Sequence, residues 1–196
     1  MNDLPALESA LQHHRPLRLP ARRRFIRAAV AVVIAPGPDG PEVLLTRRAR
    51  RTGDPWSGDV CLPGGRLSTG DAGGGAAACR EALEETGLVL TEANRIGRLH
   101  DRMTRAHSRP LPMVVSPFVY RYPEQAGDLD GNHEVAEIFW LPLSVVAGRE
   151  HRRTFHWRVG PLRLPMPSRV HQGQTVWGLT LMMLGELARV AGRAGV

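Results

Sequence analysis

Lysine is absent from the sequence, and all 26 basic residues are arginine, set against 19 acidic residues for a net charge of +7. The planar guanidinium group binds phosphate through two hydrogen bonds, so a surface that carries only arginine suits polyanionic ligands. A base-composition bias of the genome would produce the same abundance of Arg, Ala, Gly and Pro, and we favour that explanation. Net charge informs on solubility and nonspecific binding rather than on fold.

Cysteines are also scarce, since Cys61 and Cys79 are the two in the chain. They are too few for a disulfide framework, and we interpret them as buried, reduced thiols rather than as a redox pair. No apolar run reaches the roughly 18 to 20 residues that a membrane span needs. The N-terminus lacks the basic, apolar and small-residue order of a secretory signal. We therefore expect a cytoplasmic protein with no membrane contact.

The chain has 196 residues, of which 42% are hydrophobic and 23% charged, as is typical of a globular protein with a core. We predict a single domain over residues 1–196, with a helical and basic extension over about residues 1–25. Asp3 is expected to cap a helix there, whose apolar face carries Leu4, Leu7, Ala10 and Leu11. The triplet Arg22–Arg24 follows and is interpreted as a solvated face rather than a phosphate or RNA contact.

The most informative stretch covers residues 62–88, LPGGRLSTGDAGGGAAACREALEETGL. Pro63 and two glycines end an extended segment and permit a tight turn. Residues 76–86 are dense in helix formers, and Gly87 is placed to end that helix in a left-handed conformation. At 100° per residue, one arc of the helix, which we expect to face the core, carries Ala76, Cys79, Ala82, Leu83 and Thr86.

The opposite, solvent-facing side of this predicted helix carries Glu81, Glu84 and Glu85. Like charges at this spacing cost a few tenths of a kcal/mol per pair. A hard divalent cation such as Mg²⁺ or Mn²⁺ would offset that cost, because such ions take oxygen ligands. The alternative is a solvated acidic face near Arg80, which is the usual state of a surface helix.

The same stretch resembles the signature of the Nudix hydrolases. That signature has a glycine, five residues, an acid, seven residues, Arg-Glu, an apolar residue, any residue, Glu-Glu, any residue, glycine and an apolar residue. The chain matches it at Gly65, Asp71, Arg80-Glu81, Ala82, Glu84-Glu85, Gly87 and Leu88. Asp71 stands where Glu is usual, and eight residues rather than seven separate it from Arg80.

The coenzyme A pyrophosphatase branch of that family is similar on both of these points. Its upstream motif is matched at Leu44-Leu45-Thr46, Arg48, Ala49, Gly58 and Pro63-Gly64-Gly65. Leu62 replaces a Phe of that motif, one residue is added before Gly58, and Arg50 or Arg51 stands near its second Arg. A run near the C-terminus, Val176 to Thr180, also looks like one in this branch.

The remaining chain is predicted to alternate strands and turns. A hairpin joins a buried strand at 28–35 to another at 43–47, and further strands are expected at 95–99, 113–122 and 134–141. Pro117 suggests a sheet edge or a bulge in the longest of these. Two short strands surround Gly160-Pro161, and a helix starts near Thr175. The loop 100–110 is either solvated or a set of phosphate contacts from His100, Arg102, Arg105, His107 and Arg109.

The resemblance implies an α/β (α+β) fold, a mixed β-sheet sandwiched between helices, and hydrolysis of a nucleoside diphosphate linked to another group. It implies Mg²⁺ or Mn²⁺ held by Glu81, Glu85 and Glu84, with the Gly64 carbonyl as a further ligand. Arg80 is expected to orient Glu84 or Glu85. Glu134 is a candidate general base or extra ligand, with a plain strand-end carboxylate as the alternative. Substrate contacts are predicted at Arg48, Arg51, Gly65 and Arg66.

Three functions stay open at this stage. The first is hydrolysis of coenzyme A to phosphopantetheine and adenosine bisphosphate. The second is a Nudix pyrophosphatase for ADP-ribose, a dinucleotide or an oxidised nucleotide. The third is a noncatalytic, arginine-rich module for nucleic acid, which clustered carboxylates argue against. The expected partner is thus a small nucleoside diphosphate derivative, and a homodimer stays open.

Overall fold

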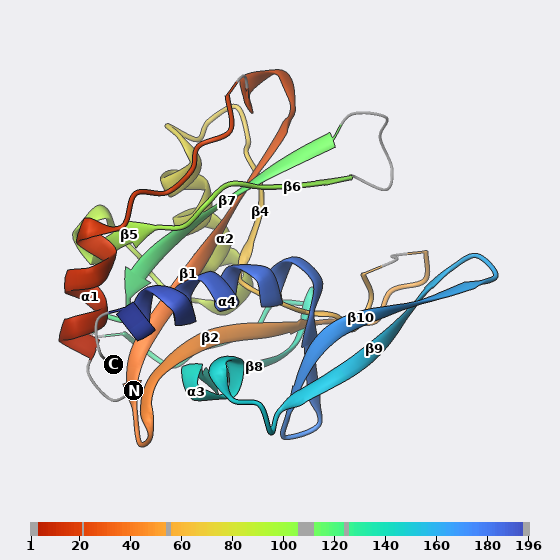
Figure 1. The fold of residues 1–196 in the computed structure, drawn as a ribbon. Helices are drawn as coiled ribbons and strands as arrows, with labels where there is room; N and C mark the ends of the chain where they lie inside the picture. The colour runs from red at the N-terminus through yellow and green to blue at the C-terminus, as the bar shows by residue number, and fades with distance from the viewer. Residues whose placement is uncertain (1–3, 21, 54–55, 106–111, 124–125, 194–196) are drawn as a thin grey trace.

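The computed structural model describes residues 4–20, 22–53, 56–105, 112–123 and 126–193 (Figure 1). Its helices are α1 (Leu4–His13), α2 (Gly74–Thr86), α3 (Leu143–Ala147) and α4 (Gly178–Arg193), with 3-10 turns at Arg22–Arg24 and Glu92–Asn94. Its strands are β1 (Ile26–Gly37), β2 (Gly40–Arg48), β3 (Val60–Cys61), β4 (Gly64–Arg66), β5 (Arg95–Arg98), β6 (Arg102–Arg105), β7 (Pro112–Arg121), β8 (Val135–Pro142), β9 (Arg152–Val159), β10 (Leu162–His171) and β11 (Gln174–Trp177). None of the helices within these ranges is long and apolar enough to cross a membrane.

An eight-stranded mixed sheet forms the centre of the molecule. Its main path runs β3-β2-β1-β7-β5, while β4 pairs with β1, β6 with β7 and β8 with β2. The pair β1 and β7 is parallel, and the other pairs are antiparallel. A separate antiparallel sheet of β9, β10 and β11 projects from one side of the molecule (Figure 1).

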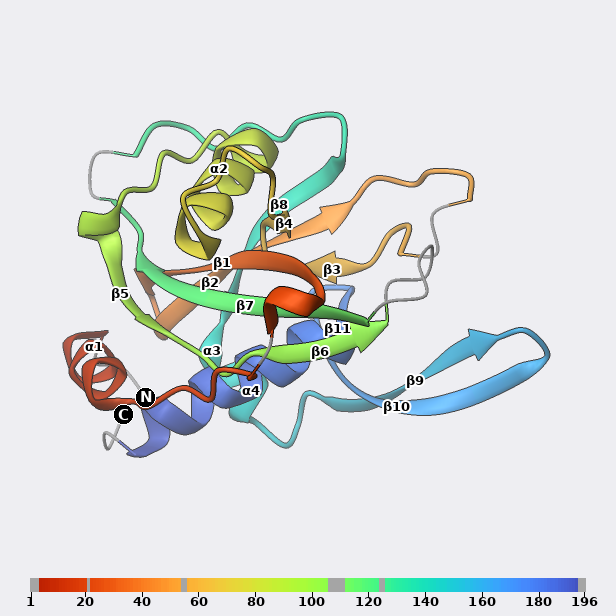
Figure 2. The same ribbon diagram turned by 90° about the horizontal axis from the view of Figure 1, so that it is seen from above.

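Helices cover both faces of the central sheet. Figure 2 shows α2 on one face of β1 and β7, with α1 and α4 on the other. Successive side chains of a strand point to opposite faces, so β1 contributes Val32 and Ile34 to the core beneath α4, and Ala31 and Val33 to the core beneath α2. This two-sided burial explains the unbroken apolar run in β1. It confirms the predicted layering of a mixed sheet between helices.

The predicted hairpin is confirmed. Strands β1 and β2 pair with Gly37 opposite Gly40, and Pro38 and Asp39 form the turn between them. Gly40 has a φ of 114°, a backbone angle that residues with a side chain rarely adopt. This angle explains why a glycine stands at the start of β2. The hairpin of β9 and β10 around Gly160 is likewise confirmed, with strands longer than expected.

Three predictions in the remaining chain are wrong. Strand β7 is internal rather than an edge, because it pairs with β1 on one side and with β5 and β6 on the other. Pro117 is tolerated there because it faces the break between β5 and β6, where the Leu99 N–H donates to its carbonyl at 3.0 Å. The helix expected from Thr175 begins at Gly178, since residues 174–177 form β11 against β10. The predicted loop 100–110 contains β6, and residues 106–111, with His107 and Arg109, lie outside the described residues.

Candidate active site

The short strand β4 brings the glycine-rich turn against the sheet. Ala31 N–H donates to the Pro63 carbonyl at 2.8 Å, and β4 then pairs with β1 from Val30 to Ala28. A side chain at Gly64 would begin only 2.4 Å from the Ala29 carbonyl oxygen, so no other residue fits without moving the backbone. The turn is therefore held in one place relative to the core.

Helix α2 follows and lies on β1 through small side chains, with Ala77, Ala78 and Ala82 fully buried. It ends as predicted at Gly87, whose φ is 70° and whose N–H donates to the Leu83 carbonyl at 2.9 Å. The predicted core arc is wrong in part, because Leu83 is 49% exposed and Glu85 only 6%. Close packing of the alanines on β1 and β4 turns Glu85 inward, towards the glycine turn.

Glu85 lies deep between α2 and β4. Its Oε2 accepts a hydrogen bond from the Gly64 N–H at 3.0 Å. Burial raises the pKa of Glu85 to about 7; the charges of Glu81 and Glu134 act in the same direction, and the Gly64 bond and Arg48 oppose them. A buried carboxylate among other acids costs free energy in its charged form, and a cation would offset that cost.

Glu81 lies one helical turn before Glu85 and faces the same strand. A side chain at Gly65 would begin 2.5 Å from the Glu81 carboxyl carbon, so the missing Cβ is what makes room for this carboxylate. Burial raises the pKa of Glu81, while its bond to Arg80 opposes the shift. Glu84 differs, because its side chain is 52% exposed at the rim of the site.

Arg80 holds the loop before α2 to the helix. Its Nε and Nη2 donate to the two carboxylate oxygens of Asp71, each at 3.1 Å, and this pairing lowers the pKa of Asp71. Its Nη1 donates to Glu81 at 2.9 Å and to Glu84 at 3.2 Å, and Nη2 also reaches the Arg66 carbonyl at 3.1 Å. All of these hydrogen bonds go to other parts of the protein. They fit the predicted role of Arg80 in orienting Glu84, and they indicate that Arg80 orients Glu81 as well.

Three of the other predicted site residues, Arg48, Arg51 and Glu134, lie close to this carboxylate pair or to one another. Arg51 Nη1 donates to Glu134 Oε1 at 3.1 Å, and both side chains are about two-fifths exposed, at 40% and 39%. The Glu134 carbonyl accepts from Ala49 N–H at 2.7 Å, which fixes the start of β8 beside the end of β2. Arg48 and Glu134 both lie near enough to Glu85 to influence its pKa. Arg66 is exposed at the end of β4.

Sequence reasoning missed a group of polar contacts between β2, β8 and β11. Arg47 donates twice to Glu137, at 3.1 and 3.0 Å, and Gln174 Nε2 donates to the same carboxylate at 2.7 Å. Trp177 Nε1 donates to Asp59 at 3.2 Å. Arg47 and Glu137 lie opposite each other on the paired strands β2 and β8. Their contact depends on the register between two strands far apart in the chain, so the sequence alone does not reveal it.

A second polar cluster lies on the opposite face of the sheet. Among the described residues, the group of His and acid side chains close enough to share an ion is His14, His100 and Glu186. The predicted phosphate contacts His100 and Arg102 therefore belong to an ion cluster with Glu186. The side chain of Arg105, another of the predicted contacts, lies outside the part of the chain that the structure describes.

The chain is similar in sequence to a known protein family. The NUDIX domain model matches residues 25–161. The chain is 34% identical over 166 residues to a Cronobacter sakazakii protein named uncharacterized Nudix hydrolase NudL, covering 83% of this chain and 81% of that one. The chain belongs to the Nudix family.

Other Nudix relatives are longer than this chain. Nudix hydrolase 15, mitochondrial, of Arabidopsis thaliana is 28% identical over 186 residues, and the match spans 87% of this chain but 60% of that protein. A Schizosaccharomyces pombe protein is 34% identical over 137 residues, 60% of this chain and 42% of its own length. The crystal structure of a MutT/nudix family protein from Enterococcus faecalis covers 97% of this chain and 70% of its own, with a TM-score of 0.58 at 16% identity, which supports the fold.

The Nudix carboxylates fit a hard divalent ion. Glu81 and Glu85 face one strand from one side of α2, and Glu84 lies at the rim, so oxygen ligands of the kind that Mg²⁺ and Mn²⁺ prefer are grouped there. Burial, with the nearby charges of Glu81 and Glu134, raises the pKa of Glu85, so a bound cation would favour its charged form. The room over Gly65 lets the Glu81 carboxylate occupy the site without moving β4.

Proposed function

We propose that this Nudix protein is a metal-dependent pyrophosphohydrolase and that coenzyme A is its substrate. The observation that carries the hydrolytic proposal is the pair of inward-facing carboxylates, Glu81 and Glu85, against the glycines of β4. A noncatalytic nucleic-acid module has no need for a buried carboxylate of raised pKa next to its polyanion. The products would be phosphopantetheine and adenosine bisphosphate.

Glu81 and Glu85 would hold Mg²⁺ or Mn²⁺, with Glu84 and the Gly64 carbonyl completing the protein ligands. The ion would neutralise the pyrophosphate and polarise its phosphorus–oxygen bonds. Arg80 keeps Glu81 and Glu84 in place through its bonds to both. The hydrolysis itself needs a water that attacks phosphorus, and the bond from that phosphorus to the bridging oxygen breaks.

Glu134 is the proposed general base for that water. It lies close enough to Glu85 to affect its pKa, and Arg51 holds one of its carboxylate oxygens at 3.1 Å. A positioned base typically contributes 10²- to 10⁴-fold to the rate. Glu134→Gln should therefore lower kcat by about 100-fold, and its pH–rate profile should lose the acidic limb. A pH–rate profile identical to that of the wild type would mean that Glu134 is a strand-end carboxylate with no role as a base.

The substrate proposal rests on the arginines that follow β2. Coenzyme A carries a ribose phosphate besides its pyrophosphate, so several anionic groups need partners at once. Arg48 and Arg51 lie beside the carboxylate site, where they can meet a ligand held there. Leu62, which departs from the coenzyme A motif, is only 2% exposed and so affects packing rather than substrate contact.

A hydrolysis panel tests this proposal. Coenzyme A, ADP-ribose and NADH would be compared by kcat/KM with Mg²⁺ and with Mn²⁺, and we expect coenzyme A to be preferred. The kcat/KM for dephospho-coenzyme A should be about tenfold lower than for coenzyme A, because one charge-assisted hydrogen bond is lost. Arg48→Ala or Arg51→Ala should remove that preference. Arg153→Ala is the control, because within the described residues the Arg153 side chain donates to the backbone carbonyls of Glu150 and Arg152 and not to a site residue.

The second candidate function is a Nudix pyrophosphatase for another diphosphate. It is favoured by the residue added before Gly58, which changes the spacing of the coenzyme A motif. Ready hydrolysis of ADP-ribose with no cleavage of coenzyme A or its thioesters would reject the first proposal and support this one. The homodimer and the cytoplasmic location stay predictions.

A further inference from the structure

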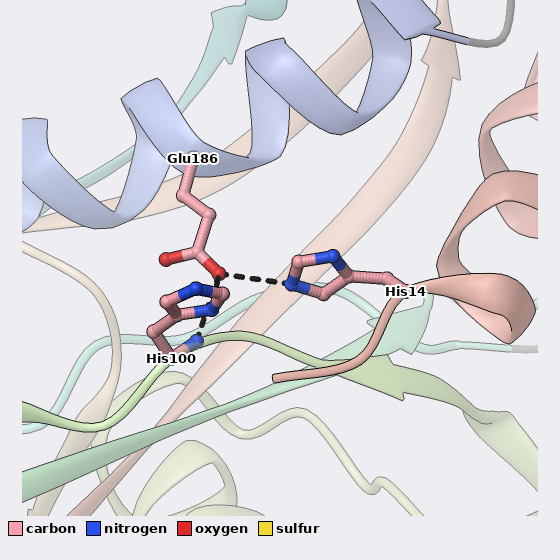
Figure 3. Close-up of side chains that lie close together, drawn as sticks. All are labelled: His14, His100 and Glu186. Carbon is pink, nitrogen blue, oxygen red and sulfur yellow. Dashed lines mark hydrogen bonds and ion pairs between the residues drawn. The ribbon is translucent and has the colours of Figure 1, made fainter. Parts of the chain in front are cut away.

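Three segments far apart in the chain meet on the face of the sheet opposite α2. His14 follows α1, His100 lies between β5 and β6, and Glu186 projects from α4 with only 2% of its surface exposed (Figure 3). Figure 3 shows both imidazole rings beside the Glu186 carboxylate. We propose that His14, His100 and Glu186 form a second metal site, separate from the Nudix carboxylates, and that its ion is Zn²⁺.

The distances between the three side chains suit ligands of one ion. Glu186 Oε1 lies 3.0 Å from His14 Nε2 and 2.5 Å from His100 Nδ1, and the ligand atoms all lie within 4.8 Å of one another. A tetrahedral ion about 2.0 Å from each ligand separates its ligands by about 3.3 Å. Shifts of under about 1 Å would meet that geometry. The His100 side chain, 36% exposed, has room to make them.

Hydrogen bonding alone does not account for the position of His100. Glu186 Oε1 already accepts from the His100 backbone N–H at 2.8 Å and contacts His14. His100 Nδ1 is buried and lies close to this same oxygen, yet it has no hydrogen-bond partner among the described residues. The two rings stack at 5.2 Å with an interplanar angle of 16°, and each has a ring nitrogen within 3.0 Å of Glu186 Oε1. Both imidazoles therefore have a nitrogen beside the same carboxylate oxygen.

The surroundings favour Zn²⁺ over Mg²⁺. Arg102 Nη2 binds the other carboxylate oxygen, Oε2, at 2.5 Å, which fixes the carboxylate with Oε1 beside the two imidazoles. Two imidazoles and one carboxylate form a borderline donor set, which suits zinc, whereas Mg²⁺ prefers oxygen donors alone. The exposed side of His100 leaves access for a water as the fourth ligand.

Such an ion would join the N-terminal segment, the β5–β6 connection and α4. An ion that binds the folded chain but not the unfolded chain stabilises the folded state by mass action. The sheet separates α4, which carries Glu186, from α2 (Figure 2), so the ion would have a structural effect and would not contact the Nudix substrate. The proposal therefore does not depend on the proposed coenzyme A hydrolysis.

Titration of the metal-free full chain with Zn²⁺, in excess Mg²⁺ to occupy the α2 carboxylates, tests the site. We expect one equivalent of Zn²⁺ by calorimetry and a rise in Tm of about 5 °C at a hundredfold excess over Kd. Co²⁺ should give the visible absorption of a site with nitrogen ligands and low coordination number. His14→Gln and His100→Gln should lose all three signals. Both keep a polar side chain at the position, so they are expected to fold.

His13→Gln is the matched control, because His13 neighbours His14 but its Nδ1 donates to the Ser9 carbonyl at 2.8 Å within α1. It should keep the full Zn²⁺ response. Absence of Zn²⁺ binding by the wild type, or an undiminished response in His14→Gln and His100→Gln, would overturn the proposal and leave the cluster as an ion pair. If either Gln variant fails to fold, Glu186→Gln, which removes the charged ligand but keeps its shape, supplies the same comparison.

Discussion

Two buried glutamates, on opposite faces of one sheet, have opposite surroundings. Glu85 is 6% exposed and has a single backbone donor, with Glu81 and Glu134 nearby, and its pKa is raised to about 7. Glu186 is 2% exposed and meets Arg102, His14 and the His100 backbone N–H. Burial and neighbouring acids dominate at the first glutamate, whereas an arginine binds the second directly.

This difference determines what each site can bind. An acidic group short of positive charge suits a hard ion, whereas a carboxylate already paired with arginine and flanked by imidazoles suits a softer ion with nitrogen ligands. The two glutamates also differ in their effect on stability. A buried charge without a close partner destabilises the folded state, whereas a buried charge with a close partner is tolerated. The experiments below test that separation.

The largest expected effect is on catalysis at the α2 face. Glu85→Gln and Glu81→Gln should each lower kcat by about 1,000-fold, because a metal ion supplies several kcal/mol of charge stabilisation. The far-UV circular dichroism spectrum should stay unchanged. Glu150→Gln, at a glutamate whose side chain is 71% exposed, is the control and should keep full activity. Retained turnover in both site variants at low Mg²⁺ would contradict the assignment of the metal site.

The opposite result is expected on the α4 face. Glu186→Ala should lower the free energy of unfolding by about 4 kcal/mol, because it leaves Arg102 and the histidines without their buried partner. Its kcat, measured below the lowered Tm, should stay within about twofold of the wild type. Denaturant unfolding and initial rates measure the two quantities. A fall of kcat comparable to that of Glu85→Gln would contradict the assignment of stability to the α4 face and catalysis to the α2 face.

The raised pKa of Glu85 predicts a pH dependence of stability. Its folded pKa of about 7 exceeds the ordinary value of 4.5, so the folded state binds more protons between these pH values. The stability from this group is complete below pH 4.5 and is lost as pH rises to about 7, a change of about 3 kcal/mol.

Metal-free wild type should therefore lose stability relative to Glu85→Gln over that pH window. Asp71 and Asp101, with lowered pKa, change stability in the other direction, but both proteins contain them and the difference cancels their effect. Urea unfolding at several pH values gives the measurement. Parallel curves for the two proteins would mean that Glu85 binds equal numbers of protons in the folded and unfolded states, so that folding does not raise its pKa.

The smallest effect concerns the room over β4. Gly65→Ala would place a methyl group 2.5 Å from the Glu81 carboxyl carbon, and that flexible carboxylate would have to move. We expect kcat to fall about tenfold with little loss of stability. Gly70→Ala, where nothing lies within 4 Å of the added Cβ, is the matched control. Equal rates for the two variants would mean that the position of Glu81 over Gly65 does not matter.

The amino-acid sequence by itself predicted the local elements that carry the family signature. Helix α2, its end at Gly87 and the β1–β2 hairpin were all predictable, because helix propensity, glycine and turn residues act over a few positions. The match to the Nudix signature supplied the family for the same reason, since its glycines and acids are close in the chain. The functional roles of Glu81, Glu84, Glu85 and Arg80 stay predictions until the variants are measured.

Tertiary structure decided the rest, because it depends on contacts between distant residues. Packing of alanines on β1 turned Glu85 inward and left Leu83 exposed, which helical periodicity had assigned the other way. Pairing on both sides of β7 placed Pro117 inside the sheet. The Glu186 cluster unites residues separated by up to 172 positions. Periodicity fixes which side chains share a face, but only packing chooses which face meets the core and which distant charges meet one another.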